Sequence, residues 1–450
     1  MNPPSRRRFL QGTAAALAAT VIPRSVLGAN DTLAHAGIGS GGMGGGDLGA
    51  IKGHPKAQIV ALCDVDAGRL NAAAKRYPDA RQYADWREML DKEGDKVDSV
   101  NVSTPDHTHA PATMTALRMR KHVYCQKPLC HDVYECRQVA AAAKAAGVVT
   151  QLGTQAASGI GDRMAVHFLR QGVIGKARRA ILCSNRPGAI AAYRLEGPRP
   201  EKGDPVPPNL SWDLWLGTAP ERPFVNGIYH PVKWRAWQDF GTGWSGDIGC
   251  HIFDAVWKGL RLTAPKTVVA EVQKSWLESP ARRADTWPQS DHITWVFPAS
   301  EATEGDLTIE WFDGEFFPPE DVQKLAGTEP GKYPAESAMV IGTEGALLLR
   351  HGAGPQLFPK EKFEKLERPK LPGRDHYHHF VSACLGGEPT ESHFVQTGPM
   401  AEAILLGTVA IRVPNTVLEW DSANLRVSNS PEAQKLLRRT YRKGWEVEGL

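Results

Sequence analysis

Short apolar runs alternate with helix-like stretches in the first third of the chain. Strands are expected at 32–38, in QIVALCDVD (58–66), at 98–103, in HVYCQKPLC (122–130) and in VVTQLGTQ (148–155), with an alanine-rich helix at 132–146. Apolar runs of this length, separated by helical patterns, indicate βα units and a parallel sheet. The pattern therefore predicts an α/β Rossmann domain over 30–155.

The pattern changes after about residue 155. A helix is expected at 161–171 and a strand at 178–184, and a proline-rich loop follows at 197–208. VVAEVQ, HITWVF, LTIEWF and ALLLR then alternate as the strands of one open sheet do, while RDHYHHFVSACL and PMAEAILLGTVAIR have the pattern of helices. We expect an α+β domain for substrate binding and oligomerisation over 156–450.

A glycine-rich loop, GSGGMG (39–44), follows the first expected strand and precedes a helix-like stretch. The spacing Gly-x-Gly-x-x-Gly lets the backbone approach a pyrophosphate at a helix N-terminus. An overlapping set beginning at Gly37 also fits, but the later register leaves a longer strand. The cofactor contacts expected in this loop are Gly39, Gly41, Gly42, Met43 and Gly44.

Asp64 ends the second expected strand, about 20 residues after the last glycine of the motif, where the dinucleotide-binding fingerprint has its acidic residue. A carboxylate at this position accepts hydrogen bonds from ribose hydroxyls and repels a 2′-phosphate. The sequence therefore predicts that the cofactor is NAD and not NADP.

Polar residues gather just after the later strands of this domain. Because ligands of such sheets lie beyond the carboxyl ends of the strands, these residues are candidates for cofactor or substrate contacts. The expected cofactor contacts are Thr104, Pro105, His107 and Lys127, and the expected substrate contacts are His109 and Gln155.

The N-terminus has the pattern of an export signal. SRRRFL (5–10) is a twin-arginine pattern, followed by an apolar run at 13–22 and small residues near 28–29. We expect residues 1–29 to be a cleaved signal peptide and the mature protein to be periplasmic or otherwise exported. No other run of 18 uninterrupted apolar residues occurs, so no membrane partner is expected after cleavage.

Composition narrows the class of protein further. The net charge is +3 with dispersed basic residues, which gives no indication of nucleic-acid binding. The seven cysteines are an odd number without a CxxC pair, so neither a disulfide framework nor a zinc site is indicated, and buried free thiols are expected. Most of the 13 tryptophans are expected in the core, although indole faces also pack on sugar rings.

The stretch FGTGWSGDIGCHIFD (240–254) places Asp247, His251 and Asp254 at helical spacings of four and three, on one face of a helix. Apolar residues are interleaved with them, so this face is a candidate pocket wall. A metal site is the other interpretation, with HYHH (376–379) as a remote source of ligands, but the helix alone offers too few ligands and no metal is expected. HYHH itself is expected to begin a helix or to lie at the rim of a pocket.

Several motifs together resemble those of the Gfo/Idh/MocA oxidoreductases, and within that family an exported branch with twin-arginine signals. They are IGSGGMG, ALCDVD, YADWREML, STPDHTHA, CQKPL, VVTQLGTQ, SWDLWLGTAP, KWRAWQDFGTGWSGDIGCHIFD, LLGTVAIR and YRKGW, spread over nearly the whole chain after the signal. The resemblance implies a Rossmann domain, a second domain with a large, mostly antiparallel open sheet, a nicotinamide cofactor and a carbohydrate-like substrate.

The resemblance also implies catalytic residues. The family's Glu-Lys-Pro motif matches Gln126-Lys127-Pro128, with lysine kept and glutamate replaced. The family's Asp and His four residues apart match Asp247 and His251. In this interpretation Lys127 stabilises developing alkoxide, and an imidazole braced by a carboxylate takes the hydroxyl proton.

Three further residues, Lys233, Trp234 and Arg235, offer donors beside an indole face, which suits a polyhydroxy or acidic sugar. Together with Asp254 they are expected substrate contacts, although a charged loop packed on the domain is an equal alternative.

Free NAD is scarce outside the cytoplasm, so an exported NAD enzyme is best understood if it retains its cofactor.

The predicted reaction is hydride transfer between a ring hydroxyl carbon of a sugar or glycoside and tightly bound NAD, in a protein expected to be a homo-oligomer. Two alternatives stay open. One is a redox-neutral NAD-dependent glycosidase that oxidises, eliminates, adds water and reduces. The other is a binding protein for sugar or cofactor that has lost catalysis.

Overall fold

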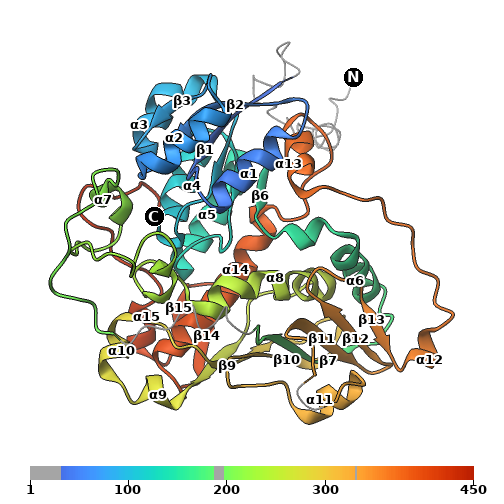
Figure 1. Ribbon diagram of the computed structural model, residues 1–450. Coiled ribbons are helices and arrows are strands. Elements are labelled where there is room, and N and C mark those ends of the chain that lie inside the picture. Colours follow the sequence, from blue (N-terminus) through green and yellow to red (C-terminus); the bar gives the residue numbers. More distant parts are fainter. Residues whose placement is uncertain (1–31, 187–196, 330–331) are drawn as a thin grey trace, which may run out of the picture.

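The computed structural model describes residues 32–186, 197–329 and 332–450. The expected signal peptide at 1–29 lies outside the described residues. In the described part, the chain forms two sheets with helices between and around them, and Figure 1 shows α8 (Gly243–Leu260) and α14 (Phe394–Arg412) lying between the sheets.

The first sheet is the predicted Rossmann sheet. Its six strands are parallel and lie in the order β3-β2-β1-β4-β5-β6. They are β1 (Leu33–Ile38), β2 (Ala57–Cys63), β3 (Arg81–Tyr83), β4 (Ser99–Val102), β5 (His122–Cys125) and β6 (Thr150–Leu152). The strand order reverses between β1 and β4, and ligands of such sheets bind beside this switch point.

Side-chain caps define where several helices of the Rossmann half begin. They are α1 (Met43–Lys52), α2 (Ala67–Arg76), α3 (Trp86–Glu93), α4 (His109–Arg118) and α5 (Val133–Ala146). Asp66 and Asp85 cap α2 and α3 with their side chains, and Asp132 and Glu135 form a capping box at the start of α5. The caps fix where the loops that follow β2 and β5 end.

The second sheet has nine strands in the order β13-β12-β11-β7-β10-β9-β8-β14-β15. They are β7 (Ala177–Ser184), β8 (Thr267–Val272), β9 (Asp291–Phe297), β10 (Thr303–Asp313), β11 (Glu336–Gly342), β12 (Ala346–Arg350), β13 (Gln356–Phe358), β14 (Leu418–Asp421) and β15 (Arg426–Val427). Only β7 and β10 pair in parallel, so the sheet is mixed and mostly antiparallel, as the resemblance implied.

The remaining helices are α6 (Ile160–Arg170), α7 (Trp212–Leu216), α9 (Lys274–Leu277), α10 (Pro280–Asp285), α11 (Glu320–Leu325), α12 (Lys360–Phe363), α13 (His376–Cys384) and α15 (Pro431–Lys435). HYHH (376–379) does begin a helix, α13, whose first turn is capped by Asp375. α13 packs against α1, so the chain returns to the Rossmann half after the nine-stranded sheet's strand β13.

α14 links the two halves through the core. One continuous apolar cluster includes residues of the Rossmann sheet, of α14 and α8, and of the second sheet. By length and hydropathy α14 resembles a membrane span, but 83% of its most apolar window is buried inside the protein. Burial on all sides explains why the helix is apolar all round.

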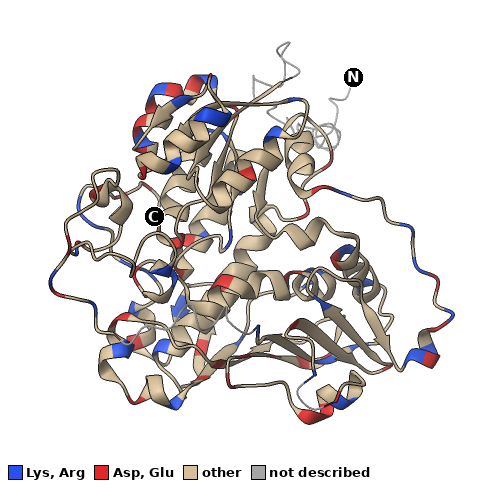
Figure 2. Ribbon diagram, viewed as in Figure 1, with Lys and Arg blue, Asp and Glu red and all other residues tan. Residues whose placement is uncertain are grey.

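Charged residues of both signs are interspersed over the described chain, as Figure 2 shows, which agrees with the small net charge. All seven cysteines are buried and free, as the sequence predicts. Trp215, Trp234 and Trp237 are buried in one apolar cluster, and of these three only Trp237 does not also line the cavity described below.

Candidate active site

The glycine loop joins β1 to α1 in the register that begins at Gly39. Gly39 has a φ of +88°, and a Cβ there would collide with the carbonyl oxygen of Ser103. A Cβ at Gly44 would collide with the carbonyl oxygen of Gly39, so only glycine lets α1 start this close to the strand. These are the first and third glycines of the dinucleotide motif, which supports the register chosen from the sequence.

Asp64 lies directly beyond β2 and faces the glycine loop. Its Oδ2 accepts hydrogen bonds from the backbone N–H groups of Ser40, at 2.9 Å, and Gly41, at 3.1 Å. Burial raises the pKa of the Asp64 carboxyl, while the backbone hydrogen bonds from Asp66 and Ser40 oppose the shift. The carboxylate is therefore held in the loop by main-chain donors, at the place where an adenosine ribose reaches in the fingerprint.

Lys127 lies beyond β5 and reaches across to the second domain. Its Nζ donates to Oδ1 of Asp247, at 2.5 Å, and to the main-chain oxygen of the same residue, at 3.3 Å. Arg235 approaches the other carboxylate oxygen of Asp247 with an Nε–Oδ2 distance of 3.8 Å. The predicted catalytic lysine and aspartate are thus brought together, each from a different domain.

One cavity of about 350 Å³ extends from the glycine loop and Asp64 to Lys127. At one end it is lined by Gly39, Gly41, Gly42, Met43 and Asp64. At the other end it is lined by Thr104, Pro105, Lys127, Trp234 and Arg235. The glycine loop and the start of α1 would hold the pyrophosphate of a dinucleotide, and Lys127 would contact its nicotinamide half, so the donor set and the cavity fit the predicted cofactor.

Two family models match the chain. The Gfo/Idh/MocA oxidoreductase model of an NAD-binding Rossmann fold matches residues 35–154, and the model of the C-terminal α/β domain of the same family matches residues 167–287. Together they span more than half of the chain. The chain belongs to the Gfo/Idh/MocA oxidoreductase family. Its cofactor is NAD, which the first model names as the ligand of the matched domain.

Several similar proteins are named as enzymes of sugar-like compounds. The chain is 34% identical over 115 residues to an inositol 2-dehydrogenase of Rubrobacter xylanophilus, covering 25% of this chain and 32% of that enzyme. It is 31% identical over 162 residues to a 1,5-anhydro-D-fructose reductase of Ensifer adhaerens, covering 35% and 47%. The matches thus span less than half the length of either relative.

The fold as a whole is similar to that of the WlbA dehydrogenase of Bordetella pertussis, solved in complex with NADH and UDP-GlcNAcA. The TM-score is 0.59 at 14% sequence identity, and the similarity covers 87% of this chain and 99% of that one. At this identity the similarity is evidence for the fold only.

The structure explains the departure from the family's Glu-Lys-Pro motif. Gln126 Nε2 donates to both carboxylate oxygens of Asp47 on α1, at 3.0 and 3.1 Å. Ser103 Oγ, at 2.7 Å, and Tyr377 OH, at 2.8 Å, donate to the same carboxylate. A glutamate at position 126 would face this buried carboxylate, so the amide is the partner that Asp47 requires.

His251 lies on the turn of α8 that follows Asp247. The expected brace is not seen, because Asp247 Oδ1 is bound to Lys127 and His251 Nδ1 is buried without a partner in the described chain. Burial, and then the positive charge of Lys127, hold the pKa of His251 well below its usual value, so the ring is neutral. The ring of His351 lies 5.1 Å away, between centroids.

Two histidines of the STPDHTHA stretch support loops and do not line the cavity. His107 Nε2 lies 3.1 Å from the main-chain oxygen of Trp215. His109 lies 2.6 Å from the carbonyl oxygen of Pro128 and 2.9 Å from that of Thr104, so it joins the loops that follow β4 and β5. The structure therefore places His107 away from the expected cofactor contact and His109 away from the expected substrate contact.

Three more predicted substrate contacts lie elsewhere. Gln155 donates to the hydroxyls of Tyr124 and Tyr377, and Lys233 is exposed outside the cavity. Asp254 is buried and forms an ion pair with Lys258, at 2.6 Å. Asp254 does not line the cavity, because it lies seven residues, about two turns, further along the same face of α8 than Asp247, where it meets a cation of its own helix.

Sequence reasoning missed several residues of the cavity wall, among them Arg69, Trp86, Asp106, Trp215 and His230. Only Asp106 had a usable signal, since it stands between Pro105 and His107 in a strand-end loop that was already singled out. The others come from helices and loops whose approach to the cavity depends on tertiary packing.

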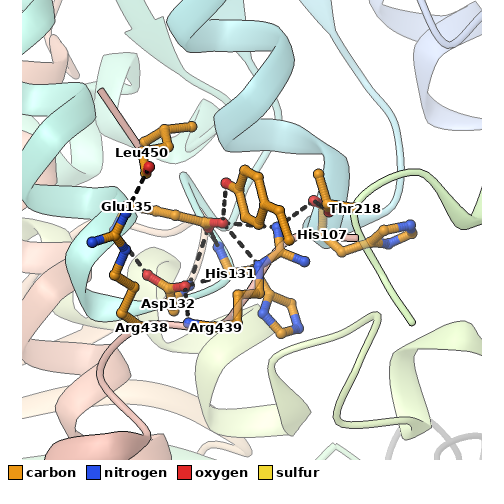
Figure 3. Close-up of polar contacts among 9 residues, drawn as sticks. His107, His131, Asp132, Glu135, Thr218, Arg438, Arg439 and Leu450 are labelled. Carbon is orange, nitrogen blue, oxygen red and sulfur yellow. Dashed lines mark hydrogen bonds and ion pairs between the residues drawn. The ribbon is translucent and has the colours of Figure 1, made fainter. Parts of the chain in front are cut away.

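The C-terminal segment holds the loops beside the cavity in place. Arg439 Nη2 donates to Glu135 Oε1, at 2.7 Å, and to the main-chain oxygen of His107, at 2.6 Å. Figure 3 shows this guanidinium between the start of α5 and the His107 loop. Arg442 donates to the main-chain oxygen of Gly217 after α7. The closing segment of the chain thus fastens the loop after β4, which carries Thr104 and Pro105.

Proposed function

We propose that this protein is an exported, NAD-dependent oxidoreductase that transfers a hydride between a ring hydroxyl carbon of a sugar or glycoside and a cofactor that it does not release. The observation that carries the proposal is one cavity lined both by Asp64 with the glycine loop and by Lys127, whose ammonium is paired with Asp247 behind it. The sugar-type names of the relatives support the substrate class.

In this proposal Lys127 donates a hydrogen bond to the reacting hydroxyl oxygen and stabilises the negative charge that develops there. Asp247 holds the lysine ammonium in place through the 2.5 Å contact, and Arg235 limits the net negative charge around that carboxylate. His251, neutral and one turn further along α8, does not line the cavity, so its part in relaying the proton runs through the Lys127–Asp247 pair and not through contact with the substrate. Bound NAD supplies the hydride acceptor.

The substrate is held at the Lys127 end of the cavity. The indole of Trp234 lines that end and packs under the guanidinium of Arg235, 4.2 Å from the ring centroid. A ring face on the indole and hydroxyls on the guanidinium are the contacts that a polyhydroxy ring requires. These two residues are the remaining candidates for sugar contacts from the predicted set.

The first test needs only the purified protein. The proposal expects a dinucleotide to remain bound through purification and its absorption near the reduced-nicotinamide band to change when sugars from a panel are added. Products are then identified by mass. A spectral change with an oxidised sugar supports the proposal, cleavage of a glycosidic bond without net redox change favours the glycosidase, and neither response indicates a binding protein.

Export and assembly are tested separately. Fusing residues 1–29 to a reporter, with both Arg6 and Arg7 changed to Lys as the control, should give export that depends on the arginine pair. Sedimentation of the mature chain should give a mass above the monomer if it is a homo-oligomer. Retention of the reporter in the cytoplasm with the intact leader would reject the export part of the proposal.

A further inference from the structure

Asp106 is a buried carboxylic acid of the cavity wall that the proposed reaction has not yet used. It follows β4 at the start of the short 3-10 helix Asp106–Thr108, and it is 2% exposed. It lines the same end of the cavity as Lys127 and Arg235. A carboxyl group buried at this position is removed from bulk water but is in reach of a ligand in the cavity.

The partners of Asp106 are few and of mixed charge. Thr242 Oγ1 donates to Oδ2, at 3.1 Å. The charged groups that act on the carboxyl are Asp247 from α8, Arg235 from the 3-10 helix before it, and Lys127 from the loop after β5. Two carboxyl groups and two cations therefore share one buried region, and the region is electrically neutral only when both carboxyl groups are ionised.

The proton affinity of Asp106 follows from this setting. Burial raises its pKa most, the negative charge of Asp247 raises it further, and Arg235, Lys127 and the Thr242 hydrogen bond oppose the shift, so that the pKa reaches about 8. Asp247 is held ionised by its direct contact with Lys127, at 2.5 Å. Of the two carboxyl groups, Asp106 is the one that can gain and lose a proton near neutral pH.

We propose that Asp106 stores, inside the site, the proton that leaves the substrate hydroxyl when the hydride is transferred, and returns it when the hydride is returned. This inference rests on the proposed function. In the oxidative direction the C–H electron pair goes to the nicotinamide, the O–H bond breaks, a carbonyl forms, and the proton ends on the Asp106 carboxylate.

Charge balance favours this coupling. The oxidised nicotinamide ring is positive and the reduced ring is neutral, so a carboxylate nearby is stabilised in the first case and less so in the second. Gain of a hydride and protonation of Asp106 therefore favour each other. The enzyme would keep both hydride and proton for a second, carbonyl-containing substrate, which suits a cofactor that never leaves.

The direct test is infrared difference spectroscopy on the protein loaded with NAD or with NADH, between pH 6 and 9. We expect a protonated-carboxyl band that is stronger with NADH than with NAD near neutral pH and that is lost in Asp106→Asn. Asp162→Asn is the matched control, because Asp162 is also buried, with a pKa raised by burial to about 7, but lies outside the cavity. An unchanged band in Asp106→Asn, or no difference between the two cofactor states, would overturn the inference.

A second variant covers the case in which Asp106→Asn does not fold. Thr242→Val keeps the carboxyl and removes its hydrogen bond, so the titration of the same band should move to higher pH. In a single turnover with a responsive sugar, the wild type should release less than one proton per cofactor reduced, and Asp106→Asn should release one. The infrared experiment needs no sugar, so it tests Asp106 independently of the substrate. Failure to oxidise any sugar would reject the proposed function without deciding the infrared result.

Discussion

Helix α8 carries two aspartate–lysine ion pairs of nearly equal length that do different things. Asp247 meets Lys127 of the Rossmann half at 2.5 Å, and Asp254 meets Lys258 of its own helix at 2.6 Å. In the first pair the lysine lines the cavity and is 16% exposed. In the second pair the side chains are 1% and 7% exposed and neither lines the cavity.

The difference shows that access, and not the distance between charges, separates a candidate catalytic pair from a structural one. Both aspartates lie on the same side of a helical wheel in the sequence, at 247 and 254, and both were predicted to contribute to the site. The sealed pair has no route to a ligand, and burial raises the pKa of Asp254 while Lys258 opposes the shift.

Replacing the two lysines in turn should separate the roles most strongly. Lys127→Met should lower kcat by roughly 10²–10⁴-fold, the usual contribution of a group that acts on the reacting proton or oxygen, with dinucleotide affinity nearly unchanged. Lys258→Met should instead lower the free energy of unfolding by about 3–5 kcal/mol, because it leaves a buried carboxylate without its partner. Turnover and chemical denaturation on both variants give the comparison.

The exposed Lys233 supplies the control, since Lys233→Met removes the same charge outside the cavity and should change neither quantity. If Lys258→Met were to lose turnover at full stability, the sealed pair would belong to the active site and the comparison would fail. A Lys127→Met protein with unchanged kcat would reject the catalytic assignment itself.

A smaller effect is expected behind Lys127, where Asp47 is held by neutral donors only. Gln126→Glu places a second carboxylate against Asp47 and should lower the free energy of unfolding by about 1–3 kcal/mol at pH 8. The facing carboxyls share a proton, so their folded pKa is raised. The loss should therefore be absent near pH 4 and grow as the pH rises through the raised value. Denaturation at several pH values measures it.

The double variant Asp47→Asn/Gln126→Glu exchanges carboxylate and amide and should restore the stability lost in Gln126→Glu. If it is no better than Gln126→Glu, the two side chains do not act as a pair. Asp313→Asn changes a buried aspartate of the second sheet, far along the chain, and shows how much of the effect is general to buried carboxyls.

The sequence pattern predicted those parts of the fold that depend on residues close together in the chain. The glycine loop, the acid at the end of β2 and most of the long apolar strands of both sheets were expected, because apolar runs of strand length, and glycines where a Cβ would collide with the backbone, fit few other structures. Strand β11 was missed, although its residues are mostly buried like those of the neighbouring strand β7. Pro334, Gly342 and Gly345 bound this run, but periodicity alone does not distinguish a short buried strand from a buried helix segment.

The site was predicted less completely, for a physical reason. The sequence places residues on helix faces and strand ends, but it does not say which neighbour satisfies each polar group. Asp254 pairs with a lysine four residues further on, and Asp47, three residues after the last motif glycine on α1, accepts hydrogen bonds from Gln126. Asp106 was not predicted because its charged neighbours, Asp247, Arg235 and Lys127, are all distant from it in the sequence and meet it only in the folded chain.

The smallest expected effect concerns His109. Lys127 and Lys258 pair with carboxylates, whereas the buried His109 ring contacts two main-chain carbonyl oxygens. Burial lowers its pKa, but Cys125 and the carbonyl oxygens of Pro128 and Thr104 outweigh burial, so the pKa lies above its usual value. A folded-state pKa above the unfolded value adds stability that is fully present below about pH 6.5 and is lost as the pH rises through the folded value. His109→Gln should remove this slope and cost about 1 kcal/mol at pH 6. Denaturation between pH 5 and 9 measures it, and a slope that survives in His109→Gln would show that the ring is neutral and that the two loops are joined without a charge, unlike either pair on α8.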